Sequence, residues 1–472
     1  MNILSKLKSL FKKNNNPPFE DYLDRANERL TLLAKNEISG QLISFSEANY
    51  TCAEGARICV GKHAPEDKQD RLDYIAKVIG RGHESTISHS NIVMLITFSG
   101  FANFNSFMDC SGAMKFLYHS TRFLKNQDKY VVLIGGSIRA YKYLIRNTPH
   151  PGDNAFIQQV INLLYQSAEK EFFTDLIKDG IMVESMFGFQ PYARAQSFHR
   201  DIMKNGRVFQ EEEIEAEDYH QETTKGKYVD IIYADNFYNI FDFVKVFGFT
   251  LRDVFRVCGC TVIFHDFSRS TSQQITRHFA GISQESQRYV NYSDSKFIDP
   301  TKFNPEKYPE CKVYKVSVDG HEMEKTAQEL GETLQKVYGQ LIDQGMLKQD
   351  ARGFLPFNVT TKLMMTFTYS DLIHFFNMRI DKAAQPEVQE MAKETYELLK
   401  LHEGSKELFE INKLEDLILE VENPVYKQDD INNQSLLDEI DEPIGLPKEE
   451  IVSVEEDKKN SEIETRKVLK YT

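Results

Sequence analysis

Short β-rich apolar runs alternate along this chain with amphipathic segments, and this alternation limits the possible fold more than any other feature. Ser90–Phe98 (SNIVMLITF) and Cys260–Ser270 (CTVIFHDFSRS) are β-branched and aromatic runs of strand length, so we expect two buried strands there. Tyr130–Arg146 (YVVLIGGSIRAYKYLIR) reads as a strand, a glycine turn and a helix. The chain is therefore expected to contain both sheet and helix.

Several helices follow from apolar spacing. Ala53–Glu84 reads as helix, loop and helix. His321–Leu347 is expected to be one amphipathic helix that ends at Gly345, where a glycine is a good C-terminal cap. Its apolar face would consist of Ala327, Leu330, Leu334, Val337 and Leu341. Two further helices are expected at Asp371–Ile380 and Glu387–Leu399, with Pro386 in the first turn of the second.

Composition excludes several classes of protein. No apolar run approaches the roughly 18 residues that cross a bilayer, and the net charge of −14 argues against non-specific nucleic-acid binding. The six cysteines have no paired metal spacing, so we expect no metal site. No secretory signal is visible at the start, and reduced thiols in the cytoplasm are the expectation.

One polar stretch points to a ligand. Gln273–Tyr289 (QQITRHFAGISQESQRY) contains two arginines, a histidine and a glutamate. The planar fork of an arginine matches phosphate oxygens, which favours a phosphate or nucleotide site. The alternative is a solvated helix face whose charges pair with one another, because structural ion-pair networks are common.

Five segments in order resemble the motifs of flavin-dependent thymidylate synthases. They are GARICV (Gly55–Val60), GHESTISH (Gly82–His89), RHFAGISQESQRY (Arg277–Tyr289), DARGFLPFNVTT (Asp350–Thr361) and HFFNMRIDKAAQPEV (His374–Val388). One such motif would be weak, but five in register make the resemblance strong. It covers residues 50–98 and 260–399.

The resemblance implies an α+β fold, with a mixed, largely antiparallel sheet flanked by helices and a mostly helical insertion. It implies methylation of dUMP to dTMP, with FAD as cofactor and with NADPH and methylene-tetrahydrofolate as co-substrates. The implied dUMP site contains Gln274, Gln284, Glu285, Ser286, Gln287, Arg288, Arg352 and Arg379. The implied FAD contacts are Ser85, Arg277, His278, Thr368, Ser370 and His374. Arg379 would be catalytic, because a permanently charged fork can stabilise negative charge on the uracil. A homotetramer with shared active sites is also implied.

The chain departs from the family pattern in three places. The family's Arg-His-Arg is Arg277-His278-Phe279 here, and its flavin turn, Asn-x-Arg, is Thr368-Tyr369-Ser370. About 160 residues separate two strands that a short connection joins in the family. Within that segment, Gly135–Asn147 resembles the flavin turn better, so a partial internal duplication would let Arg139 replace the lost contact. An ordinary strand-turn-helix with a surface arginine is the alternative.

We expect five segments: a tail at 1–20, the catalytic domain at 21–99 and 258–422, an insertion at 100–257, and an acidic disordered tail at 423–472. Two other functions stay open. The first is a related enzyme that modifies another pyrimidine nucleotide. The second is a homologue that binds nucleotide without catalysis.

Overall fold

The computed structural model describes residues 38–183, 202–204, 207–209, 222–303 and 313–405. These belong to one compact unit, Met1–Glu422. The predicted tails at 1–20 and 423–472 lie outside the described residues. No helix in the described ranges has the length and apolarity needed to cross a membrane.

The first sheet has the strand order β3-β4-β2-β1-β5-β6. Its strands are β1 (Ile38–Phe45), β2 (Ile92–Ser99), β3 (Tyr118–Leu124), β4 (Lys129–Gly136), β5 (Ile202–Lys204) and β6 (Arg207–Phe209). The pairs are antiparallel except β1 with β5, which is parallel. β2 is buried along nearly its whole length because both of its faces are covered.

The second sheet has the order β10-β13-β9-β8-β7 and is antiparallel throughout. Its strands are β7 (Thr224–Lys225), β8 (Val229–Ala234), β9 (Gly259–Ser268), β10 (Gly281–Gln284) and β13 (Thr360–Thr368). A separate hairpin joins β11 (Val313–Val318) to β12 (His321–Thr326).

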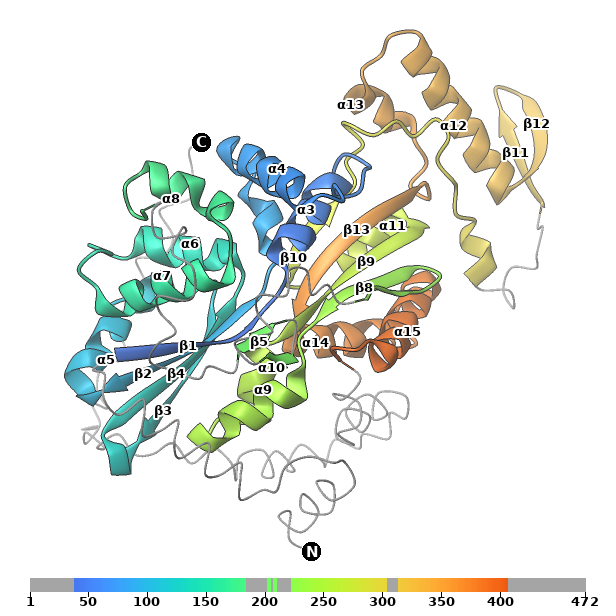
Figure 1. Ribbon diagram of the computed structural model, residues 1–472. Coiled ribbons are helices and arrows are strands. Elements are labelled where there is room, and N and C mark those ends of the chain that lie inside the picture. The colour runs from blue at the N-terminus through green and yellow to red at the C-terminus, as the bar shows by residue number, and fades with distance from the viewer. Residues whose placement is uncertain (1–37, 184–201, 205–206, 210–221, 304–312, 406–472) are drawn as a thin grey trace, which may run out of the picture. The chain divides into compact units, whose positions relative to one another are not determined.

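The helices pack around the two sheets (Figure 1). The helices before β8 are α3 (Ala48–Ile58), α4 (Lys68–Gly80), α5 (Gly100–Met108), α6 (Ile138–Asn147), α7 (Ala155–Ser167) and α8 (Thr174–Lys178). The later helices are α9 (Phe237–Val244), α10 (Leu251–Val257), α11 (Arg269–Ile275), α12 (Ala327–Asp343), α13 (Lys348–Ala351), α14 (Tyr369–Arg379) and α15 (Pro386–Leu401). Short 3-10 turns include η1 (Glu84–Ser88) and η11 (Arg352–Phe354).

The two sheets repeat one topology. The spatial order β3-β4-β2-β1 in the first corresponds to β10-β13-β9-β8 in the second, when each is numbered along the chain. A helix pair follows the first strand of each set, and two helices follow the last: α6 and α7 after β4, α14 and α15 after β13. We call residues 38–167 the first repeat and residues 229–401 the second repeat.

Equivalent hydrogen bonds confirm the correspondence. Ser46 exchanges backbone and side-chain bonds with Asn91: its N–H reaches the Asn91 oxygen at 2.9 Å, and its hydroxyl accepts the Asn91 N–H at 2.9 Å. Asp235 makes the same two bonds with Gly259, at 2.9 and 2.8 Å. Both residues follow the first strand of their repeat. The two repeats therefore share backbone geometry where their side chains differ.

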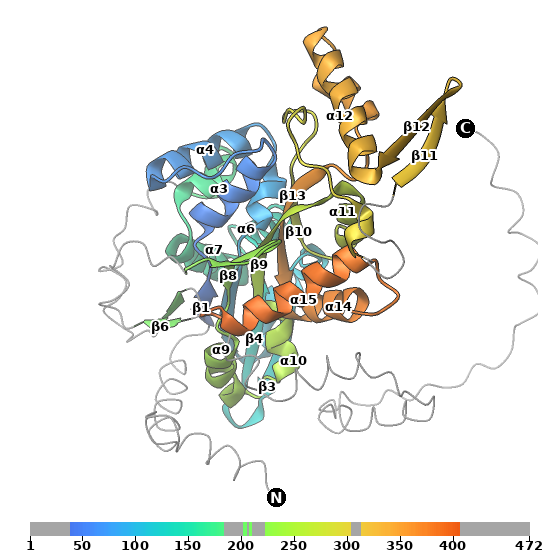
Figure 2. The ribbon, with the colours of Figure 1, turned by 90° about the vertical axis from the view of Figure 1, so that its right-hand side faces the viewer.

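Each repeat lends helices to the sheet of the other (Figures 1 and 2). One face of the first sheet packs on α5, α6 and α7 of its own repeat, and one face of the second sheet packs on α14 and α15. The remaining faces are covered across the repeats: α3 packs against β10 and β13, and α10 packs against β3 and β4. This exchange buries the junction between the repeats.

Most of the predicted elements are confirmed. The expected strands correspond to β2 and β9, the strand-turn-helix to β4 and α6, and the later helices to α14 and α15, with Pro386 at the start of α15. The α+β class is also confirmed. The structure has two sheets where we expected one, because residues 118–136 form two strands: β4 pairs with β2, and β3 pairs with β4. Residues 100–257 hold α5–α10 together with β3–β8, so this segment completes the first sheet and begins the second.

The prediction for residues 321–347 is wrong in two respects. Residues 321–326 form strand β12, so the helix begins at Ala327, after an N-cap at Thr326. Its buried residues are Gly331, Gln335 and Tyr338. Two residues of the predicted apolar face lie outward, Leu334 at 48% and Val337 at 39% exposed, whereas Leu341 packs beside Tyr338 and Ala351. Gly331 faces the Phe297 ring so closely that an added Cβ would lie 2.5 Å from it. Because Gly331 has no side chain, this face of α12 can pack closely against Phe297.

Candidate functional site

The turn after β10 is polar and exposes an arginine. The Glu285 N–H donates to the Lys362 oxygen at 2.9 Å, and the Ser286 N–H then donates to the Cys59 oxygen of the first repeat at 3.1 Å. The chain thus leaves the sheet and turns beside α3. Gln287 is buried, whereas Arg288 is exposed. Both repeats fix the backbone of this turn, and its arginine reaches solvent.

Glu285 is held from two sides. Its carboxylate accepts a hydrogen bond from the Tyr292 hydroxyl at 2.5 Å, and its backbone oxygen accepts one from Arg269 at 3.1 Å. Burial and the neighbouring Glu285 carboxylate raise the pKa of Tyr292, so the phenol stays protonated and donates. Glu285 is therefore an acceptor in a fixed position.

A second cluster joins α11 to α14. Arg379 donates from Nε to His278 Nε2 at 2.8 Å and from a terminal nitrogen to the Gln274 backbone oxygen at 2.8 Å. Burial, Arg379 and His374 lower the pKa of His278 to about 4. His278 is thus neutral near pH 7, and because Nε2 accepts, its proton sits on Nδ1. The Gln274 side chain also bonds to Gln385.

A cavity of about 500 Å³ lies at the junction of the repeats. The N-terminal ends of α6 and α14 both border it. Their caps are equivalent: Ser137 accepts the Ala140 N–H at 3.3 Å and Thr368 accepts the Asp371 N–H at 3.1 Å. Such helix ends favour anions. The lining residues include Glu84, Ser88, Phe116, Tyr118, Ser137, Arg139, Arg146, Arg256, Phe279, Thr366, Thr368 and Asp371.

The charges around this cavity differ in how far they are neutralised. Arg146 pairs with Glu84 at 2.9 Å and also contacts Asp175. The buried Lys142 lies 2.7 Å from Asp175 and 3.4 Å from Glu84. Burial lowers the pKa of Lys142 to about 8. Burial alone would raise the pKa of Glu84, but the nearby charges of Lys142 and Arg146 hold it below the ordinary value.

Two arginines remain available to a ligand. Arg139 and Arg256 line the cavity with exposed side chains, and neither forms an ion pair within the described ranges. Arg139 sits in the first turn of α6, and Arg256 sits in the last turn of α10. Together with the two helix N-termini, these arginines give the cavity groups that favour an anionic ligand, beside the carboxyl groups of Glu84 and Asp371.

His89 connects the repeats beneath the cavity. Its Nδ1 lies 3.0 Å from the Thr366 hydroxyl and its Nε2 lies 2.8 Å from the Ser283 hydroxyl. Burial lowers its pKa to about 3, so it is a neutral structural histidine. Gly55 makes room for it, since a Cβ there would lie 2.3 Å from the ring. The motifs Gly55–Val60 and Gly82–His89 therefore meet at this ring.

The predicted residues fall into three groups in the structure. Gln284, Glu285, Ser286, Gln287 and Arg288 form the turn after β10, and Gln274, His278, His374 and Arg379 form the α11–α14 cluster, with the rings of His278 and His374 5.6 Å apart. Thr368 lines the cavity, whereas Ser85, Arg277 and Ser370 are exposed. Arg352 is exposed in η11. It lies one turn beyond Lys348, whose ammonium donates to the Tyr289 oxygen at 2.9 Å.

Sequence reasoning missed part of the cavity. Arg256, Phe116 and Tyr118 have no motif around them, and only the topology places them beside Thr368. Arg139 had a signal in its resemblance to the flavin turn, and it does lie in the same cavity as Thr368.

Three cysteine thiols in the described residues are kept protonated by burial. Burial raises the pKa of Cys52 to about 12 and raises those of Cys258 and Cys260 further above the ordinary value. These thiols are therefore not nucleophiles. No group of three metal-ligating side chains occurs in the part of the chain that the structure covers.

Known proteins resemble part of the chain. A family model described as "Thymidylate synthase complementing protein" (Thy1) matches residues 193–402. The flavin-dependent thymidylate synthase of Pyrococcus furiosus is 30% identical over 149 residues, which cover 31% of this chain and 57% of that protein. The enzyme of Geobacter sulfurreducens is 31% identical over 158 residues, covering 33% and 62%. The chain thus spans about three-fifths of these relatives.

One solved structure is also similar: a flavin-dependent thymidylate synthase from Helicobacter pylori, in complex with FAD and dUMP. It is 18% identical and covers 34% of this chain and 77% of its own, with a TM-score of 0.25, which adds nothing to the argument on the fold. The family model and the curated relatives show that the chain is similar to flavin-dependent thymidylate synthases over part of its length.

Proposed function

We propose that this chain methylates dUMP to dTMP, with methylene-tetrahydrofolate as the carbon donor and NADPH-reduced FAD as the hydride source. The observation that carries the proposal is the family match over residues 193–402. This range contains all of the residues assigned here to dUMP. The first repeat contributes the other wall of the cavity.

The turn after β10 suits a nucleotide phosphate. Such a phosphate carries close to two negative charges and binds best to cations that no protein carboxylate already neutralises. Arg288 and Arg352 are exposed, and among the described residues neither has an ion pair. We assign the phosphate to these two arginines, with Ser286 and the backbone of the turn beside them.

The cavity between the repeats suits FAD. Its volume is in the range of cofactor pockets. Its two helix N-termini and the unpaired Arg139 and Arg256 match a diphosphate, and the exposed rings of Phe116 and Phe279 match an aromatic ring system. Bound there, the flavin would supply the hydride that completes the methyl group. Thr368 and Ser137 would hold it, and Arg139 would replace the arginine absent from the Thr368–Ser370 turn. Ser85, Arg277, His278, Ser370 and His374 remain candidate contacts.

Arg379 is suited to the uracil. Its bonds to His278 and to the Gln274 oxygen orient the guanidinium without neutralising it, because both partners are uncharged. Burial and the neighbouring Arg277 lower its pKa, but an arginine keeps its proton at physiological pH. We assign to Arg379 the stabilisation of negative charge on the base.

Two further properties belong to the proposal. We place the enzyme in the cytoplasm, in line with its free cysteines. We also propose a homotetramer, since Leu334 and Val337 give α12 an apolar face that is exposed in the single chain.

A second candidate is a homologue that binds nucleotide without catalysis. Phe279 stands where the family has a basic residue, and it lines the cavity. The absorbance spectrum of the purified full chain separates the two functions. We expect flavin bands that bleach on addition of NADPH in the absence of oxygen. A chain without flavin bands, even after incubation with FAD, would support the second candidate.

A further inference from the structure

We propose that the chain carries one nucleotide site, formed on the second repeat, and that a structural ion pair between Arg122 and Asp253 closes the equivalent place on the first repeat. The identity of the nucleotide rests on the proposed function. The count of sites rests on the repeated topology.

Strand register fixes which residues correspond. Gly281 of β10 pairs with Thr366, two residues before the cap of α14, and Tyr118 of β3 pairs with Gly135, two residues before the cap of α6. Counting forward from Gly281 and Tyr118, Ser120 corresponds to Ser283 and Arg122 to Glu285. The two positions can therefore be compared directly.

The position on the second repeat is open. Ser283 bonds to His89, which the first repeat supplies. The chain then leaves the sheet after Gln284, and the turn that follows carries Arg288 into solvent. Backbone contact with Cys59 of the first repeat holds the turn in place. Both repeats build this site, although the dUMP residues all come from the second.

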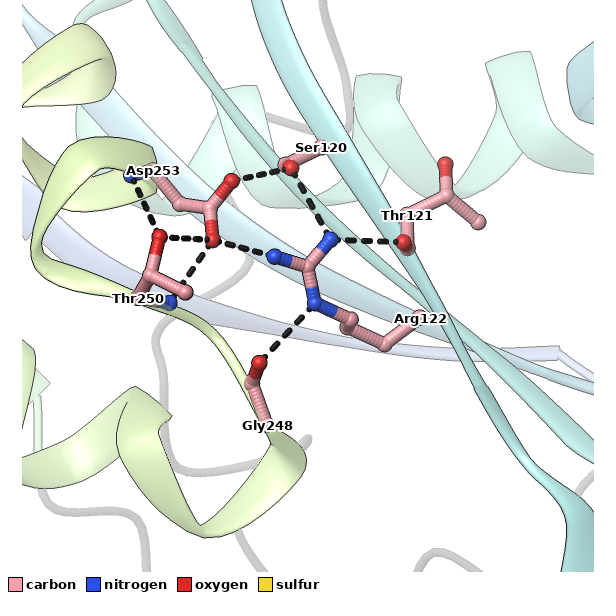
Figure 3. Close-up of polar contacts among 6 residues, drawn as sticks. All are labelled: Ser120, Thr121, Arg122, Gly248, Thr250 and Asp253. Carbon is pink, nitrogen blue, oxygen red and sulfur yellow. Dashed lines mark hydrogen bonds and ion pairs between the residues drawn. The ribbon is translucent and has the colours of Figure 1, made fainter. Parts of the chain in front are cut away.

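On the first repeat, the equivalent position lies within a continuous strand. β3 continues to Leu124 and returns through a short turn to Lys129, so no loop corresponds to residues 286–288. Ser120 bonds to Asp253 of α10, whereas the equivalent Ser283 bonds to His89 (Figure 3). The same exchange of helices across the repeats brings Asp253 there on α10.

The Arg122 guanidinium is directed toward acceptors within the protein, and Asp253 neutralises its charge (Figure 3). It donates to the Asp253 carboxylate at 2.5 Å, to the Gly248 oxygen at 2.9 Å and to the Thr121 oxygen at 3.0 Å. All three nitrogens of its guanidinium are used.

The Asp253 carboxylate accepts further hydrogen bonds within the protein. It accepts the Thr250 N–H at 2.7 Å and the Thr250 hydroxyl at 2.8 Å, as part of the capping box of α10. Opening this place would cost an ion pair and a helix cap together. The contact therefore fastens α10 to β3 and binds nothing else.

Calorimetry of dUMP binding to the full chain, saturated with FAD, tests the count. We expect about one dUMP per chain. Arg122→Ala should leave the number of sites and the Kd unchanged, because Arg122 contacts no nucleotide. Two dUMP molecules per chain, or a reduced number in Arg122→Ala, would overturn the proposal.

Thermal unfolding tests the ion pair without any ligand. Arg122→Ala leaves the largely buried Asp253 without its cation, so Tm should fall by about 2–4 °C or more. Arg81→Ala, at an exposed arginine beyond α4, is the control and should leave Tm unchanged. An unchanged Tm in Arg122→Ala would overturn the structural role. A parent chain that binds no dUMP would overturn the proposed function and the site count with it, whereas the thermal result judges the ion pair in either case.

Discussion

Arg379 binds the protein through two different edges of one planar group, and that geometry separates it from lysine. Arg379→Lys keeps the charge but loses the fork, and a single ammonium cannot satisfy His278, the Gln274 oxygen and a uracil together. We expect kcat to fall by about 10²-fold, with a smaller change in dUMP affinity. Reduction of the flavin by NADPH should continue. Steady-state kinetics at parental rates would exclude this role.

Arg288 and Arg352 should act on binding. Replacing either by alanine removes a charge-assisted bond to the phosphate, and we expect a loss of about 1.5–3 kcal/mol in dUMP binding free energy. Calorimetry measures it, with Arg81→Ala as the matched exposed control. Unchanged affinity in both site variants would remove these residues from the site.

His278 makes stability depend on pH. Its folded pKa of about 4 lies below the ordinary value of 6.5. Between these two values the unfolded chain binds a proton that the folded chain does not, so stability falls as pH drops from 6.5 to 4. Buried His89 contributes in the same direction. Thermal unfolding across this range should show a shallower slope in His278→Asn than in the parent. Equal slopes would contradict the assigned neutral state.

At the scale of single elements, Gly259 illustrates how closely the strands of the second sheet approach. A Cβ at Gly259 would lie 1.8 Å from the Phe367 oxygen, at the start of the β9–β13 pairing. Gly259→Ala should therefore destabilise the fold by about 1–3 kcal/mol. Gly112→Ala, where a Cβ would meet nothing within 4 Å, is the control. Chemical denaturation that gives equal stabilities would show that the pairing adapts.

Elements were predictable where periodicity and burial agree. The apolar residues of β2 and β9 and most of those of α15 face a core. The buried face of α12 could not be predicted in this way. The apolar residues Leu334 and Val337 lie on an exposed face, whereas Gly331, Gln335 and Tyr338 pack against the protein. β3 was missed because its sequence, YHSTRFL, is half polar and only partly buried.

At the scale of the whole molecule, the sequence indicated the repeat only through the resemblance of residues 135–147 to the flavin turn. Equivalent positions hold different residues, such as Ser46 and Asp235, so register and hydrogen bonds reveal the correspondence and sequence does not. The turn at 284–288 and the Arg379 cluster were named in advance from motifs. Arg256 and Phe116 were not, because folding alone brings β3, α10 and α14 together.

The exposed face of α12 makes the oligomer testable. We expect light scattering to show a homotetramer, and Leu334→Glu combined with Val337→Glu to lower the mass by placing charge on an apolar contact. Lys336→Glu, on an exposed polar position of the same helix, should leave it unchanged. A parent chain that elutes as a stable monomer would count against shared sites.

Turnover by the purified full chain tests the central claim most directly. With dUMP, methylene-tetrahydrofolate, NADPH and FAD, we expect dTMP to form, and we expect its formation to require every one of the four and to fall strongly in Arg379→Lys. Absence of dTMP from a folded, flavin-loaded chain that binds dUMP would contradict the account.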